Sequence, residues 1–258
     1  QQDAQDVSQN IKFEEAKKEE AQAKFQFAKD KIFDFVDTAL KKIKDLDFDF
    51  NFGKSVEVSH IFQHADVSLK DINIDVANGS LRIVPWDQND VRVECYAKVY
   101  RVDSEQAARE QFLKDVVFSI EGDKLRFITQ QKWMKLDAVL YIPQTQYEKV
   151  RVRMFNGPIS SEELTVNDYW AKTANGKIEL AGVYGQKIEA ETANGQIQIK
   201  RSKIDKLEAE TINGAINLEG DFQDVELHSF NGNVACHLTG NRCGTVVAKV
   251  TTGSIDLF

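Results

Sequence analysis

Five glutamates in the C-terminal half of the chain fall into two columns when the sequence is written with a period of about 19 residues. Glu189, Glu208 and Glu226 form one column, and Glu191 and Glu210 form the next. Coils that stack at the strand spacing of roughly 4.8 Å would bring these five carboxylates onto one face. Like charges at that distance repel by about 1 kcal/mol even in water, so the face would attract a cation or a basic partner. The columns therefore predict a binding site for a cationic ligand, with an ordinary solvated surface as the alternative.

Hydrolysis is a second chemistry that carboxylates can perform. A glycoside hydrolase needs a pair of acids in a cleft that is distinct from any repeat. Here the acids belong to the repeat, and neither a phosphate loop nor the motifs of nucleophilic hydrolases stand out. We expect no enzymatic activity and no cofactor, and keep a carbohydrate-active β-helix enzyme as an alternative.

Metal binding is the third chemistry to consider, because His228, Cys236, His237 and Cys243 lie close together in the sequence. Adjacent strand residues such as Cys236 and His237 point to opposite faces and cannot both reach one ion. We therefore expect no metal site. The chain has three cysteines in all, Cys95, Cys236 and Cys243. This odd number also argues against a disulfide scaffold.

Aromatic side chains offer a further route to ligand binding, since their faces stack on sugars and peptides. We expect most of them to pack the irregular coils instead. They are Trp86, Trp133, Trp170, Tyr141 and Tyr147.

The elements that would position the glutamates are marked by a recurring Asn-Gly pair. Both residues tolerate the backbone of a tight corner. The predicted corner residues are Asn78, Gly79, Asn156, Gly157, Asn175, Gly176, Asn194, Gly195, Asn213, Gly214, Asn231 and Gly232, and Thr252-Gly253 ends the series.

Apolar and polar residues alternate with a period of two on both sides of each pair, which is typical of half-buried strands. Ile178, Ile197 and Ile216, for example, each lie three residues after the corner Asn. Independent hairpins have no reason to keep such columns, whereas stacked coils do. We therefore predict a mainly β protein, a β-solenoid similar to a right-handed β-helix with coils of about 19 residues, and keep a β-meander as the alternative.

The N-terminal segment has a different period. Apolar residues recur there every three or four positions, which predicts an amphipathic helix. The stripe consists of Phe25, Ala28, Ile32, Phe35, Ala39, Ile43 and Leu46. We expect this helix to cap the first coils or to pair with a second copy of itself. Alternation resumes after the stripe, so the predicted division is a helical segment over 1–45 and a solenoid domain over 46–258.

Within the solenoid domain, we expect irregular coils over 46–154 and regular coils over 155–258. The irregular part should contain a short helix capped by Asp103 or Ser104 and a hairpin through Glu121 and Gly122. The final copy should leave a strand edge open, which predicts self-association through that edge. Pairing of the N-terminal helix with a second copy of itself is the other predicted route to self-association.

Composition limits the partners. A formal net charge of -8 argues against nucleic acid, because phosphate binding needs clustered Lys and Arg. No apolar run approaches the roughly 20 residues of a membrane-spanning helix. Gln1 opens the chain with neither a Met nor the pattern of a signal peptide, so we expect a mature form or an excised fragment, from which targeting cannot be read.

The repeated T-A-N-G-x-I-x-L and I-x-V-x-N-G-x-L-x-I patterns resemble the bacterial family of β-strand-repeat domains of unknown function that are named as candidate adhesins. A helical segment before such a domain is similar to LiaX-type proteins of the Gram-positive cell-envelope stress response. This resemblance implies a protein at the cell surface or outside the cell. It also implies that the protein senses daptomycin or cationic antimicrobial peptides, engages a membrane protein and regulates membrane adaptation. An adhesin-like structural binding domain is the alternative that the resemblance leaves open.

Overall fold

The computed structural model describes residues 54–129 and 131–258, and the elements below lie in these ranges. The predicted N-terminal helix over 1–45 and the strand expected directly after it lie outside the described residues. In the N-terminal half the strands are β1 (Ser55–His64), β2 (Asp71–Trp86), β3 (Val91–Tyr100), β4 (Val117–Glu121), β5 (Lys124–Thr129) and β6 (Met134–Pro143), and the helix is α2 (Glu105–Asp115). In the C-terminal half the strands are β7 (Gln146–Asn156), β8 (Ile159–Glu162), β9 (Thr165–Asn175), β10 (Ile178–Ala181), β11 (Tyr184–Asn194), β12 (Ile197–Asn213), β13 (Ile216–Asn231), β14 (Val234–Leu238), β15 (Thr245–Thr252) and β16 (Ile255–Leu257).

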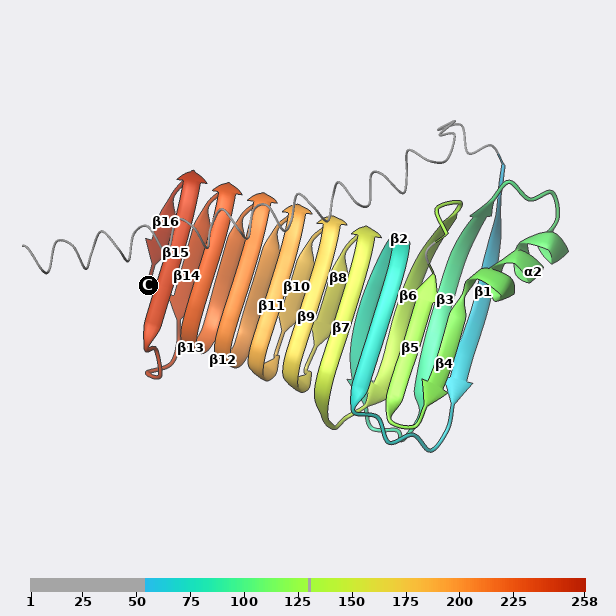
Figure 1. The fold of residues 1–258 in the computed structure, drawn as a ribbon, viewed down its shortest axis with the longest axis horizontal. Helices are drawn as coiled ribbons and strands as arrows, with labels where there is room; N and C mark the ends of the chain where they lie inside the picture. The colour runs from blue at the N-terminus through green and yellow to red at the C-terminus, as the bar shows by residue number, and fades with distance from the viewer. Residues whose placement is uncertain (1–53, 130) are drawn as a thin grey trace, which may run out of the picture.

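The C-terminal half is a parallel β-solenoid, as the repeat predicted. Strands one coil apart pair in parallel, and Ile188 lies opposite Leu207 while Asn194 lies opposite Asn213. The offset between paired residues equals the period of the sequence repeat. The parallel pairing rules out the β-meander, whose neighbouring strands would be antiparallel. The coils lie side by side along the long axis of the molecule, from β7 to β15 (Figure 1).

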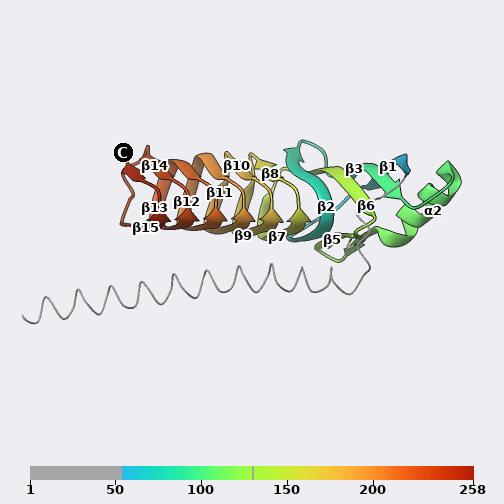
Figure 2. The ribbon, with the colours of Figure 1, turned by 90° about the horizontal axis from the view of Figure 1, so that it is seen from above.

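Each coil contributes to two layers. The strands that precede the corners, β7, β9, β11 and β15, form one layer, and β8, β10 and β14 form the other (Figure 2). In β12 and β13 one continuous strand passes from the second layer of one coil into the first layer of the next. Side chains that point between the layers form the core, where Ile178, Ile197 and Ile216 stack and are 0% exposed.

The Asn-Gly corners are confirmed and are held by stacked side chains. The amide of Asn194 donates to Oδ1 of Asn175 at 2.8 Å, and Asn213 donates to Asn194 at the same distance. Beside this asparagine row, the Thr192 hydroxyl donates to the carbonyl of Gly176 at 3.0 Å. Because each coil repeats these bonds, the corners keep the strands in register.

The N-terminal half differs from a plain solenoid. β2 pairs in parallel with β7, and its corner Asn78 lies opposite Asn156 across 78 residues of sequence. β6 pairs in parallel with β2 but antiparallel with β3, and β3 pairs antiparallel with β1. The predicted irregular elements are present: Ser104 caps α2, and β4 and β5 form a hairpin around Gly122. The antiparallel strands therefore close one end of the parallel array.

At the other end, β15 and β16 expose apolar side chains. Val247, Ile255, Leu257 and Phe258 are 36%, 42%, 53% and 72% exposed. The self-association that the sequence predicts at this edge stays a prediction.

Candidate functional site

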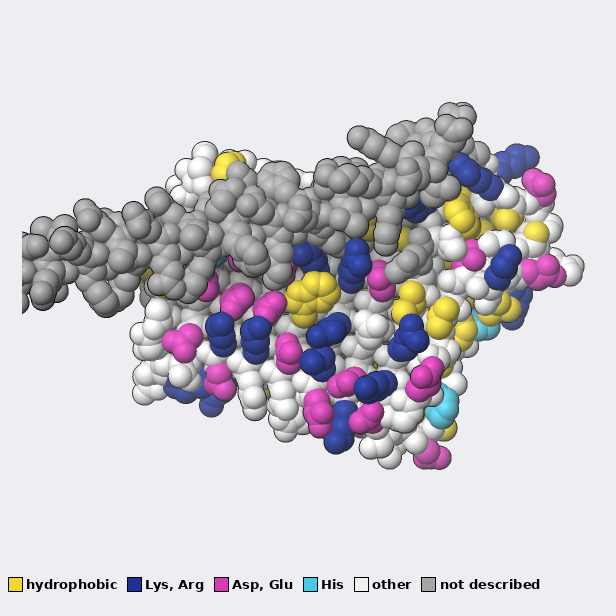
Figure 3. Space-filling model, in the orientation of Figure 1, with side chains coloured by type: hydrophobic (Ala, Val, Ile, Leu, Met, Phe, Trp, Pro, Cys, Tyr) yellow, Lys and Arg dark blue, Asp and Glu magenta, His cyan; other side chains and the backbone are white. Residues whose placement is uncertain are grey.

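The five predicted glutamates all lie on the outward side of the layer that precedes the corners, which we call the glutamate face. Glu189, Glu208 and Glu226 are direct neighbours in β11, β12 and β13, as their column predicted. We call these three the acidic row. Glu191 and Glu210 are likewise neighbours, two residues nearer the corners. Lys, Arg, Asp and Glu side chains lie beside one another on this face (Figure 3).

The acidic row is partly exposed and partly neutralised. Glu208 and Glu226 have side chains that are 29% and 33% exposed, whereas Glu189 is 18% exposed. Lys187 donates to Glu189, a hydrogen bond that is the main cause of the raised pKa of this lysine. Lys206 lies 2.7 Å from Glu208. These lysines come from the same strands two residues earlier, because alternate residues share a face.

Glu191 is not available as the sequence suggested. It points outward, but it is only 4% exposed, and Lys172 donates to its Oε2 at 2.5 Å. The indole of Trp170 donates to the other carboxylate oxygen at 3.2 Å. The carboxylate of Glu191 is therefore taken up by a buried ion pair, and its outward position does not make it a free surface charge.

Glu210 meets a histidine rather than open solvent. Nδ1 of His228 lies 3.3 Å from Oε1 of Glu210, and Nε2 of the same ring lies 3.4 Å from Oε1 of Glu226. His228 is 4% exposed. The imidazole thus bridges the two glutamate columns at β13, and Glu208 and Glu226 are the most exposed carboxylates of the predicted set.

The residues that suggested a metal are separated by the fold. Cys236 is buried in the core, where burial raises the pKa of its thiol to about 11, and His237 is exposed on the opposite side of the strand. Cys243 is exposed in the loop before β15. Within 54–129 and 131–258 the structure shows no group of three or more His, Cys, Asp or Glu side chains that could hold a metal ion.

Most of the aromatic residues pack the fold, as expected. Tyr147 is fully buried, and its hydroxyl donates to the carbonyl of Pro143 at 2.6 Å. The indole of Trp133 donates to Asp115 at 3.3 Å. The ring centroids of Trp86 and Tyr141 lie 5.3 Å apart.

One hollow was missed by sequence reasoning. A pocket of about 550 Å³ lies between three loops, and its lining includes Leu69, Trp86, Asn89 and Gln144. Trp86 was singled out as an aromatic residue, but the loops that surround it come from separate parts of the chain. No periodic signal in the sequence connects them.

The stacked register, the asparagine corners and the two layers define the class of this protein as a parallel β-solenoid domain. The chain belongs to the Toastrack DUF4097 family, whose model matches residues 63–258. This confirms the resemblance to a β-strand-repeat family, whereas the likeness to LiaX-type proteins stays a prediction. Within the described residues, no helix has the length and apolar character that crossing a membrane requires.

Among its relatives, the chain is 49% identical over 227 residues to the uncharacterized protein YvlB of Bacillus subtilis strain 168. The match covers 88% of this chain and 62% of YvlB, so the chain spans less than two thirds of that relative. Similar solved structures include a candidate adhesin from Bacteroides fragilis, with a TM-score of 0.49 and 12% identity over 79% of this chain and 97% of that one. Another is a candidate cell adhesion protein from Clostridium sporogenes, with a TM-score of 0.45 and 10% identity over 79% of this chain and 99% of that one.

Proposed function

We propose that this protein is a non-enzymatic binding module of the bacterial cell envelope, at the cell surface or outside the cell. Its ligands are cationic amphipathic peptides, including antimicrobial peptides and calcium-bound lipopeptides such as daptomycin, and binding reports envelope stress to a membrane partner that adjusts the membrane. The observation that carries the proposal is the acidic row, three carboxylates stacked in register across β11, β12 and β13.

The spacing of the acidic row suits a basic helix that lies along the solenoid axis. Side chains on one face of a helix recur roughly every 5.4 Å, and strands in neighbouring coils recur roughly every 4.8 Å. Over three coils the two spacings stay within about 1–2 Å of each other. A helix with Lys or Arg on one side could therefore place one cation near each glutamate.

The ends of the acidic row supply apolar contact. In the same column, Trp170 lies beside Glu189 on β9, and Val247 lies beside Glu226 on β15. Val247 is 36% exposed. A ligand that is both cationic and apolar fits this arrangement better than a simple polycation.

The lysines that now pair with the acidic row do not prevent binding. The side chains of Lys187 and Lys206 are 44% and 54% exposed. Ion pairs this exposed contribute about 0–1 kcal/mol, so a ligand cation can displace them at little cost in free energy. The displaced lysines would return to solvent.

The test is titration calorimetry with a cationic amphipathic peptide, at low and at physiological ionic strength, with and without calcium. The test variant carries Glu208→Gln and Glu226→Gln. The matched control carries Glu179→Gln and Glu219→Gln, which remove two charges from the opposite layer. We expect the test variant to bind at least about tenfold more weakly, the control to bind like the wild type, and added salt to weaken binding because charges are screened beyond roughly 8 Å.

Two results would remove the proposal. One is the absence of binding heat for the wild type at low salt. The other is equal affinity of the two double variants, which would show that the peptide does not use the acidic row. Binding of a neutral cell-wall glycan with no peptide binding would favour the adhesin-like alternative instead.

A further inference from the structure

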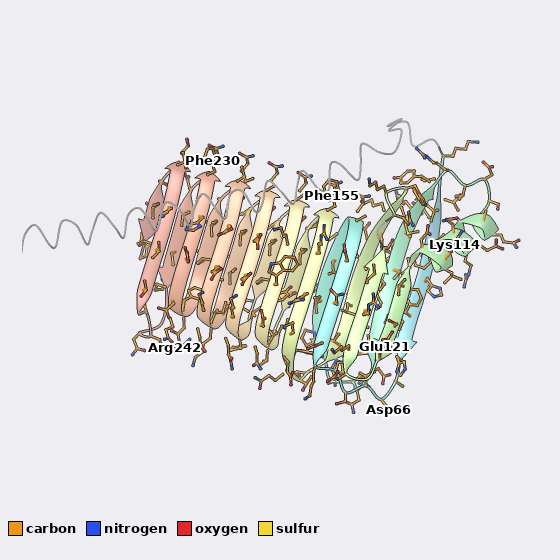
Figure 4. The ribbon with its side chains drawn as sticks, viewed as in Figure 1. Asp66, Lys114, Glu121, Phe155, Phe230 and Arg242 are labelled. Carbon is orange, nitrogen blue, oxygen red and sulfur yellow. The ribbon has the colours of Figure 1, made fainter. Side chains whose placement is uncertain are left out.

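A row of small and apolar side chains runs along the glutamate face at its upper edge, next to the corners. These side chains point outward, one position before each corner asparagine. The row, which we call the apolar row, consists of Ala77, Phe155, Ala174, Ala193, Ile212 and Phe230. Phe155 and Phe230 lie at the same edge of the solenoid (Figure 4). Ala193 and Ile212, with Phe230 packed against them, form an apolar cluster separate from the core.

A second row beside it is ionic. It occupies the outward positions three residues before each corner. This ionic row consists of Asp75, Arg153, Lys172, Glu191, Glu210, His228 and Lys249. Its sign changes along the axis, from the carboxylate of Asp75 on β2 to two cations on β7 and β9, then to two carboxylates on β11 and β12, and finally to His228 and Lys249.

Both rows are more buried than an open sheet face allows. Ala174 is 0% exposed, Ala193 is 2% and Ile212 is 8%, and in the ionic row Lys172 is only 5% exposed. Lys and Glu are almost never this buried on an uncovered surface. Yet none of the strands and helices described within 54–129 and 131–258 lies over this face (Figures 1 and 2). The part of the face next to the corners, which carries these two rows, is therefore built to be covered.

We propose that residues 11–46 of this same chain cover it, as an amphipathic helix that lies along the solenoid axis with its apolar stripe on the apolar row. The charges favour this occupant. Residues 11–46 carry nine Lys and eight Asp or Glu, a mixture that suits an ionic row of changing sign. A uniformly cationic segment would match only the carboxylates of this row. This inference is independent of the proposed function, which concerns the acidic row.

The dimensions also agree. From Phe25 to Leu46 the stripe would span about 32 Å as a helix, at about 1.5 Å per residue. The six coils of the apolar row span about 24 Å at the strand spacing of roughly 4.8 Å. Each helical turn therefore meets about one strand, so apolar side chains can alternate along the interface.

Chain connectivity sets the direction of the helix. β1 lies three strands away from β2 in the sheet order, roughly 14 Å. The eight residues 47–54 reach up to about 26 Å when extended, which is enough to lead from β1 back onto the solenoid. The end of the stripe near Leu46 should thus lie over β2 and β7, and Phe25 should lie towards β12 and β13.

The experiment is hydrogen exchange of the full chain, read by mass spectrometry. Ile212→Asp adds a charge to the apolar row, and Asn217→Asp adds the same charge to the outward side of the opposite layer as a control. In the wild type we expect amides in 11–46 to exchange at least about tenfold more slowly than in an unstructured chain. Ile212→Asp should remove this protection and Asn217→Asp should keep it. Phe35→Asp, which changes the segment and leaves the solenoid untouched, should have the effect of Ile212→Asp.

The outcomes separate the possible occupants. Exchange of 11–46 at unprotected rates in the wild type would overturn the proposal. So would protection that survives both Ile212→Asp and Phe35→Asp while the solenoid strands stay protected. Protection that grows with protein concentration, together with a dimer in sedimentation, would assign the face to a second copy and also overturn it. No peptide ligand is used, so failure of the proposed function leaves this result unaffected.

Discussion

Replacing Gly195 by alanine tests the stacking of the corners most directly. A Cβ built on Gly195 would lie 1.9 Å from the carbonyl oxygen of Gly176 in the coil before it. Both atoms belong to rigid backbone, so the coils must separate locally by roughly 1.5 Å to reach ordinary contact. Three hydrogen bonds cross this gap: Gly176 N to Asn194 O at 3.0 Å, Asn194 to Asn175 at 2.8 Å, and Thr192 to Gly176 O at 3.0 Å.

At about 1 kcal/mol for each hydrogen bond, their loss should lower the free energy of unfolding by about 3 kcal/mol. For a domain of this size that corresponds to a fall in Tm of about 6–12 °C. The control is Gly244→Ala, where the added Cβ would meet the carboxylate of Asp224 at 3.3 Å, a side chain that can move, and the carbonyl oxygen of Gln223 at an ordinary contact distance of 3.7 Å. We expect the control to change stability by less than about 1 kcal/mol.

Thermal and urea unfolding, followed by circular dichroism, measure both variants. Equal stability of the two would refute the reasoning, because it would mean that the corner backbone can yield without losing its hydrogen bonds. A loss of stability in Gly195→Ala with unchanged exchange at the neighbouring corners would also contradict it.

Three further predictions concern the coils and the thiols. Deletion of residues 176–194 removes one whole coil and restores every column, so this variant should fold with a circular dichroism spectrum similar to that of the wild type, whereas a variant that lacks nine residues of that coil should not fold. Similar melting of the two variants would contradict the solenoid register. Ile197→Asp places a carboxylate at a fully buried site and should lower the free energy of unfolding by several kcal/mol, whereas Gln196→Asp on the outward side should lower it by under about 0.5 kcal/mol in the same unfolding assay. Equal melting temperatures of the two variants would contradict the assignment of Ile197 to the core and of Gln196 to the outward side. Iodoacetamide at pH 8 should modify the exposed thiol of Cys243 and spare that of Cys95, because burial raises the pKa of Cys95 to about 12 and keeps its thiol protonated at pH 8. Mass spectrometry of the labelled peptides measures the modification, and equal labelling of the two cysteines would contradict the burial of Cys95.

The regular half could be predicted because its information is periodic. Each coil repeats the same apolar and corner positions, so the spacing of Asn175, Asn194 and Asn213 was enough to place one strand on the next. The neighbour relation of Glu189 and Glu208 followed from the same spacing, since residues in one column of a parallel array must stack. Local pattern also sufficed for the start of α2, because an N-cap is a short-range interaction.

The burial of Glu191 could not be predicted in this way. Alternation along a strand determines which face a side chain occupies, but exposure depends on what packs against that face. The pairing with Lys172 across one coil was visible in the column, yet its burial was not. The strand pairing of the irregular half could not be predicted for a related reason. β3 and β6 pair antiparallel through non-local contacts that no repeat encodes.

The stacked coils also have a mechanical consequence. Backbone hydrogen bonds between neighbouring coils run along the long axis, whereas the covalent strands lie across it (Figure 1). Tension between the two ends of the solenoid would load the coil interfaces in series, so extension should begin at the weakest interface and proceed by peeling. Tension along one strand would load many hydrogen bonds in shear at once and meet higher resistance. The molecule should therefore be mechanically anisotropic, and single-molecule pulling along the two directions should give distinct rupture forces.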